Sequence, residues 1–185
     1  MTGVQTCALP ISGVFHEDGL ADTVDGLGGG QDREQRLAIM KDSRIGTYGT
    51  LALILCVALK AATLSTFTLS HAALVLFAGH GAGRAAAVIA MCASPYASDP
   101  DTAKSKPAPV GVTAGECALG LVLGVWPLAL LPVTQALIGA AAGCLSAGAV
   151  AFAARRLIGG YTGDVLGATE QIFEVGFLLG AAAMI

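Results

Sequence analysis

The sequence predicts an all-α, polytopic helical bundle embedded in a membrane, and three observations lead to this fold class. Of the 185 residues, 55% are hydrophobic and only 12% are charged, whereas about a quarter of a typical soluble domain is charged. The apolar residues form runs near the length of about 20 residues that carries a helix across a bilayer. These runs are rich in Ala and Gly, which let helices pack closely in lipid. The composition excludes a disordered chain, and the net charge of -3 excludes a basic nucleic-acid-binding protein.

The first twelve residues, MTGVQTCALPIS, are set apart from the fold prediction. They resemble a translation of sequencing-adaptor DNA, and they lack the basic region and the sustained apolar core of a signal peptide. We expect residues 13–185 to form a single domain, and we expect this chain to be a fragment whose natural N-terminus is missing.

Five apolar runs are expected as membrane-spanning helices. The fourth run ends at Arg155 and Arg156, and Pro132 requires a tight turn between the third and the fourth. The five runs cover residues 48–66, 68–92, 110–133, 134–154 and 172–185.

The basic residues predict the orientation of these helices. When the crossings are counted, three basic groups fall on one side of the membrane, and Lys60 alone falls on the other. The positive-inside rule makes the basic side cytoplasmic, so every polar segment is expected to converge on one face of the membrane. The three groups are residues 33–44, Lys104 with Lys106, and Arg155 with Arg156.

The chemistry is expected in a catalytic loop, residues 16–49, which holds more than half of the acidic residues. Asp18, Asp22 and Asp25 are spaced i, i+4 and i+7, so in a helix they share one face and repel one another. One or two divalent cations would relieve this repulsion, and carboxylate oxygens are ligands that suit Mg²⁺ or Mn²⁺. The alternative is a solvated acidic helix face.

The rest of this segment offers groups that bind phosphate. Gly28 and Gly29 would allow the backbone to approach a phosphate, or they form a flexible turn. Lys41 and Arg44 would bind phosphate oxygens, or they anchor the chain at the membrane surface. Asp42 is a candidate metal ligand or a salt-bridge partner.

A second polar motif covers residues 155–174 and carries a candidate substrate site or second site. Thr162 and Asp164 lie in a Gly-rich turn, and Glu170 and Glu174 follow at i, i+4 spacing. Because a carboxylate in lipid is costly, Glu174 is expected to face a partner or a cavity, or to be protonated or directed to the membrane surface.

The second apolar run contains His80 and Arg84 one turn apart, in the string GHGAGR. An arginine in a membrane span needs a partner or a wet cavity, so both residues are candidates for binding a substrate phosphate, and a purely structural pairing is the alternative. The glycines of this string would let another helix approach. Structural roles are expected for His71 and Glu116.

The strings HEDGLADTVDG, KDSRIGTYG and GGYTGDVLGATEQIFE, at residues 16–26, 41–49 and 159–174, together resemble the cobalamin synthase family, from about residue 15 to the C-terminus. The resemblance implies an all-helical enzyme of the bacterial inner membrane. It would join α-ribazole or its 5′-phosphate to adenosylcobinamide-GDP, with Mg²⁺, and release GMP. This would make adenosylcobalamin or its 5′-phosphate in the last steps of cobalamin biosynthesis. The chain departs from the family in lacking the membrane helices ahead of the first motif and in reading HGAGR where the family reads closer to HALSR. Its expected partners are these substrates and the lipid bilayer, and a homo-oligomer is a further possibility.

Several residues remain alternatives within this mechanism. The base that takes the proton of the ribose hydroxyl is Asp22, Asp25 or His16. Asp164 would complete the metal site or bind the ribazole. Two other functions are weighed: a CDP-alcohol phosphatidyltransferase-like enzyme, because the first motif contains Asp-x-x-Asp-Gly, and a small membrane transporter with acidic residues lining a cation path.

Overall fold

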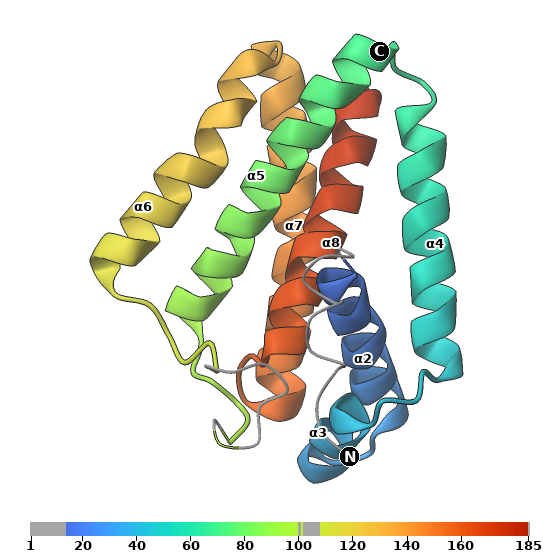
Figure 1. The fold of residues 1–185 in the computed structure, drawn as a ribbon, viewed down its shortest axis with the longest axis vertical. Helices are drawn as coiled ribbons and strands as arrows, with labels where there is room; N and C mark the ends of the chain where they lie inside the picture. Colours follow the sequence, from blue (N-terminus) through green and yellow to red (C-terminus); the bar gives the residue numbers. More distant parts are fainter. Residues whose placement is uncertain (1–13, 100, 102–107, 185) are drawn as a thin grey trace, which may run out of the picture.

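The computed structural model describes residues 14–99, 101 and 108–184, and these residues form a helical bundle (Figure 1). Two short helices come first, and the longer helices that follow are joined by turns and by one loop between α5 and α6. The elements are α2 (Phe15–Gly29), α3 (Arg33–Lys41), α4 (Thr47–Leu64), α5 (Leu69–Ala93), α6 (Ala114–Val125), the 3₁₀ helix η2 (Trp126–Leu130), α7 (Val133–Ile158) and α8 (Gly163–Ala182).

Four of the described helices, α4, α5, α7 and α8, are long and apolar enough to cross a bilayer. Their outer faces carry large apolar side chains in contact with the surroundings, among them Ile54, Phe77 and Leu145. Lipid is the solvent that such faces require. The expected helical membrane bundle is therefore confirmed.

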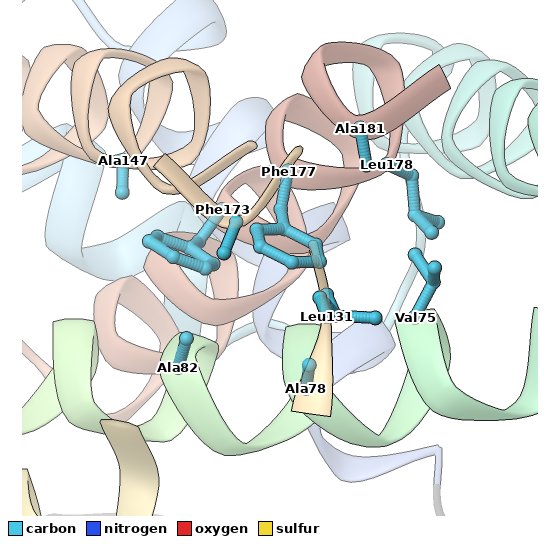
Figure 2. Packing of buried hydrophobic residues seen from close by; sticks show 10 residues of the cluster. Val75, Ala78, Ala82, Leu131, Ala147, Phe173, Phe177, Leu178 and Ala181 are labelled. Carbon is cyan, nitrogen blue, oxygen red and sulfur yellow. The ribbon is translucent and has the colours of Figure 1, made fainter. Parts of the chain in front are cut away.

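Helix α8 is the central helix of the bundle. In an 18-residue apolar stretch of α8, 78% of the residues are buried, whereas the corresponding shares are 17% in α4 and 22% in α7. Phe173 and Phe177 stack at 6.1 Å between ring centroids and form the main core with small and branched residues of α5 and α7 (Figure 2). Two charged side chains of α8, Glu170 and Glu174, are consequently held deep inside the protein.

Glycines make this packing possible. A Cβ at Gly139 would lie 2.9 Å from the ring of Phe177, and a Cβ at Gly143 would lie 2.9 Å from the ring of Phe173. On α5, a Cβ at Gly81 would lie 2.7 Å from the carbonyl oxygen of Gly124 in α6. The expected role of small residues in close helix contacts is confirmed.

The third expected span differs most from the structure. Helix α6 has only 12 residues and passes into η2 at Trp126. Pro127 lacks a backbone N–H and therefore breaks the α-helical hydrogen-bond pattern at this point. The tight turn at Pro132 is confirmed, because α7 begins at the next residue. Glu116 has the expected structural role, since it forms a capping box with Thr113 at the start of α6.

The bounds of the last two spans are also corrected. Helix α7 continues to Ile158, so Arg155 and Arg156 lie in its last turn, where cations suit the helix dipole. It ends at Gly159, whose φ of 86° is in the left-handed region that glycine adopts readily. Helix α8 begins at Gly163, nine residues before the expected start, because the Thr162 hydroxyl caps it by accepting from the N–H of Val165.

Helix α2 runs antiparallel to the first half of α8. Its first turn lies about halfway along the bundle, and its last turn lies at the end where α3 is found (Figure 1). The two backbones meet closely: a Cβ at Gly19 would lie 2.8 Å from the carbonyl oxygen of Asp164, and a Cβ at Gly167 would lie 3.1 Å from Cα of His16. Residues 16–49, marked by the sequence as one polar segment, thus form α2, α3 and the start of α4.

The basic segments gather at one end of the bundle. Arg33 donates to the carbonyl oxygen of Ile158 at 2.9 Å and to that of Ala97 at 2.7 Å, and Arg155 reaches the carbonyl of Ala93. Lys104 and Lys106 lie outside the described residues, as do residues 1–12. Lys60, which is expected on the other side of the membrane, lies in the second half of α4, and its ammonium points into the bundle, to α8.

Candidate functional site

A cavity of about 360 Å³ lies between α2, α5 and α8, and we call it the α2–α8 pocket. Three segments that are distant in the sequence supply its polar groups: the first motif, the GHGAGR string and the second polar motif. Its lining residues are Phe15, His16, Arg84, Ala87, Pro109, Gly163, Leu166, Gly167 and Glu170.

Glu170 connects the polar groups of this pocket. Its Oε2 lies 2.9 Å from Nε2 of His16, and its Oε1 lies 3.4 Å from the guanidinium of Arg84. The Glu170 side chain is only 3% exposed, whereas those of His16 and Arg84 are 32% and 59% exposed. The carboxylate is therefore buried behind two side chains that remain accessible from the cavity.

A second polar group lies one turn farther along α8. Glu174 contacts the ammonium of Lys60 through Oε2 and Nδ1 of His80 through Oε1, and Lys60 also donates to Oε1 of Gln171 at 2.6 Å. The expectation that Glu174 faces a partner is confirmed. These contacts join α4, α5 and α8 inside the apolar part of the bundle, where an unpaired charge would be costly.

A separate cavity of about 260 Å³ lies at the other end of α2, and we call it the α3–α4 pocket. From the first to the last turn of α2 is about 20 Å, at 1.5 Å per residue. The sequence candidates therefore fall into two groups that no small ligand can contact together. This pocket is lined by Asp25, Gly29, Ile39, Asp42, Arg44, Gly46, Thr47 and Tyr48.

Asp25 holds the start of α4 to α2. Its two carboxylate oxygens accept the N–H groups of Gly46 at 2.7 Å and Gly49 at 2.9 Å, and its side chain is buried. A Cβ at either glycine would lie within 2.5 Å of an Asp25 oxygen. The KDSRIGTYG string thus places two glycines where the aspartate needs direct access to backbone amides.

The basic side chains of this region have unequal surroundings. Arg44 forms a bidentate pair with Asp42 at 2.6 Å, and this hydrogen bond raises the pKa of the exposed Arg44 guanidinium. Lys41 is exposed in the last turn of α3. Gly28 and Gly29 occupy the last turn of α2, an end that presents backbone carbonyls and so attracts cations more than phosphate.

The three aspartates of the first motif lie on one helix, as expected. Asp18 is exposed and Asp22 is buried, and Asp18 is about 10 Å from Asp25 along the axis of α2. One ion cannot bind all three carboxylates across that distance. The backbone of Asp164, in the first turn of α8, packs against Gly19, so Asp164 lies beside the turn of α2 that carries Asp18 and Asp22.

Sequence reasoning missed Tyr161 as an organising residue. Its hydroxyl accepts from the N–H of Gly111 at 2.7 Å and donates to the carbonyl of Pro109 at 2.8 Å, and burial raises the pKa of the phenol. This fixes Pro109 at the α2–α8 pocket. His71, as expected, has a structural partner, since its Nε2 lies 2.9 Å from Oε1 of Gln135.

Comparison with known proteins identifies sequence relatives of the chain. The family model described as cobalamin-5-phosphate synthase matches residues 4–182. Two relatives are named adenosylcobinamide-GDP ribazoletransferase. The one from Shewanella piezotolerans is 46% identical over 169 residues, which cover 89% of this chain and 65% of the relative. The one from Bradyrhizobium diazoefficiens is 44% identical over 185 residues, which cover 99% of this chain and 70% of the relative. The chain thus spans about two thirds of the length of these relatives. No solved structure matches it.

Proposed function

We propose that this chain, which belongs to the cobalamin-5-phosphate synthase family, is an adenosylcobinamide-GDP ribazoletransferase. The reaction would join α-ribazole or its 5′-phosphate to adenosylcobinamide-GDP and release GMP. The names of the relatives support this proposal. The structural observation that carries it is the α2–α8 pocket, where three distant motifs place a histidine, an arginine and a buried glutamate around one cavity.

The groups of the pocket suit transfer of a substituted phosphate. Such reactions depend mainly on positioning and on stabilising negative charge. The guanidinium of Arg84 is accessible and is suited to bind phosphate oxygens of the donor. His16 is held by Glu170 and faces the cavity, so it would accept a hydrogen bond from the ribose hydroxyl of α-ribazole and direct that oxygen toward the phosphorus.

Mg²⁺ belongs to this proposal as the cofactor. Asp18 and Asp22 fit it, because they are one helical turn apart on α2 and offer the oxygen ligands that Mg²⁺ prefers. Asp25 fits less well with the same ion, because of its distance from Asp18 and its two bonds to backbone amides. The ion would stabilise negative charge on the diphosphate.

The location of the enzyme follows from its charges. The described basic segments lie at one end of the bundle, together with both motifs. By the positive-inside rule this end faces the cytoplasm, so the pocket would take soluble substrates from that side of the inner membrane.

The test is a direct assay of the chain in detergent or in liposomes. With adenosylcobinamide-GDP and α-ribazole, we expect GMP and the joined product, both detected by mass spectrometry. Arg84→Ala should raise the apparent KM for the donor at least tenfold, while Arg156→Ala, an exposed arginine away from the pocket, should leave it unchanged. Absence of GMP release from folded protein, or activity with CDP-diacylglycerol instead, would refute the assignment.

A further inference from the structure

We propose that His80, Glu170 and Glu174 form a binding site for a first-row transition-metal ion such as Mn²⁺, separate from the aspartates of α2. One ligand atom from each residue can be chosen so that all three lie within 4.8 Å of one another. A neutral imidazole with two carboxylates is a mixed nitrogen and oxygen donor set, which suits Mn²⁺, Fe²⁺ or Zn²⁺ better than the all-oxygen preference of Mg²⁺.

A buried oxygen without a hydrogen bond points to a ligand at this place. In the described part of the chain, Oε1 of Glu170 is inaccessible to solvent and accepts no hydrogen bond, and its side chain is 97% buried. The Arg84 guanidinium lies 3.4 Å from this oxygen, an ion-pair distance without hydrogen-bond geometry. Oε2 of the same carboxylate is taken by His16. A buried carboxylate oxygen in this state is costly, and a bound cation removes the cost.

The local charges favour a cation. Glu170 and Glu174 are accompanied by Glu17, the neighbour of His16 on α2, whose Oε2 is also buried without a hydrogen bond among the described residues. Two cationic side chains, Lys60 and Arg84, contact this group. Glu17, Glu174 and Lys60 all lie near Cys56. With His16 and His80 neutral, three carboxylates therefore outnumber two positive charges in this region.

The ligand atoms of Glu174 and His80 are suitably placed to bind an ion. Lys60 contacts Oε2 of Glu174, which leaves Oε1 directed at Nδ1 of His80. The His80 side chain is 47% exposed, so its Nε2 has room to carry the proton while Nδ1 binds the ion. Binding then requires a change of tautomer and no loss of the Lys60 contact.

The position also explains how an ion would reach the site. Glu170 lines the α2–α8 pocket and Arg84 lies at its exposed side. Glu174 and His80 line a smaller recess between α5 and α8, one turn deeper. The three ligands thus stand where the open pocket meets the buried part of the bundle.

The experiment measures binding of Mn²⁺ alone to the purified chain in detergent, without substrates, so its outcome is independent of the transferase activity. We expect one tightly bound equivalent, and pulsed electron paramagnetic resonance should detect coupling to one imidazole nitrogen. His80→Ala should weaken binding about 100-fold and abolish the nitrogen coupling. His71→Ala, which removes the other histidine of the same helix, should retain both, as should Asp22→Asn.

Two further variants keep the proposal testable if His80→Ala fails to fold. His80→Asp should keep the ion and lose the nitrogen signal. Lys60→Met removes a competing charge beside Glu174 and should tighten binding about tenfold. Nitrogen coupling that persists in His80→Asp, or folded wild-type protein that binds no Mn²⁺, would overturn the site whether or not the chain is an active transferase.

Discussion

The contact between α7 and α8 gives a quantitative test of the fold, through Gly180→Ala. The added Cβ would lie 2.8 Å from the carbonyl oxygen of Ile138, 2.9 Å from Cβ of Ala142 and 3.0 Å from Cα of Gly139. Ordinary contacts of carbon atoms are about 3.5–4.0 Å. Because the obstructing atoms are mainly backbone, the two helices must separate by several tenths of an ångström.

The cost follows from what this separation does to the core. Overpacking of this kind costs about 1–3 kcal/mol, and a gap of about 0.5 Å removes about a quarter of the dispersion energy at the contacts that open. Alanine regains up to about 1 kcal/mol because it favours a helix more than glycine does. We therefore expect Gly180→Ala to lower the free energy of unfolding by about 1–2 kcal/mol.

Gly148→Ala is the matched control. Gly148 lies in α7, where a Cβ would meet no atom within 4 Å, so the same substitution should leave stability unchanged or raise it by up to about 1 kcal/mol. Unfolding in mixed micelles of mild detergent and dodecyl sulfate, followed by circular dichroism, measures both variants. Equal stability of the two would refute the close approach of α7 and α8 at Gly180.

Three other variants test the polar contacts. Tyr161→Phe should cost about 1–3 kcal/mol of stability, because it leaves the Gly111 N–H and the Pro109 carbonyl without the phenol, and hydrogen exchange should rise at Gly111. Asp25→Asn places an amide NH₂ against a glycine N–H, so both stability and activity should fall, the former measured by thermal unfolding. Asp22→Asn should lose Mg²⁺-dependent GMP release by about 100-fold or more without a matching loss of thermal stability, and near-normal turnover would contradict its role as a metal ligand.

The sequence predicts the class of fold well because apolar run length and small-residue content are local properties. It places α4 and α5 within one or two residues. It errs at α6 because the run of apolar residues does not reveal that Pro127 ends the α-helix. It also misses the start of α8, where polar residues of the motif are already helical. Hydropathy alone cannot separate a loop from a polar helical turn that is buried by its neighbours.

The candidate site shows a different limit of prediction from a single sequence. Periodicity correctly places Asp18 and Asp22 on one face of a helix, and the cost of a charge in lipid correctly predicts a partner for Glu174. The identity of that partner depends on tertiary packing, since Lys60 is 114 residues away in the sequence and His80 is 94. One sequence carries no signal for such a pair beyond the expectation that each charge must be compensated.

The polar residues of α8 also determine how this helix is oriented in the bundle. Phe173 and Phe177 must face the glycines of α7, and this rotation directs Glu170 and Glu174 away from α7, toward α2, α4 and α5, where their partners are found. A helix turned by about a quarter of a rotation would bring both carboxylates against the apolar surface of α7 and leave Lys60 unpaired. Because burying an unpaired charge costs several kcal/mol, the same contacts that assemble the pocket exclude the alternative packing, and the fold and the site are specified together.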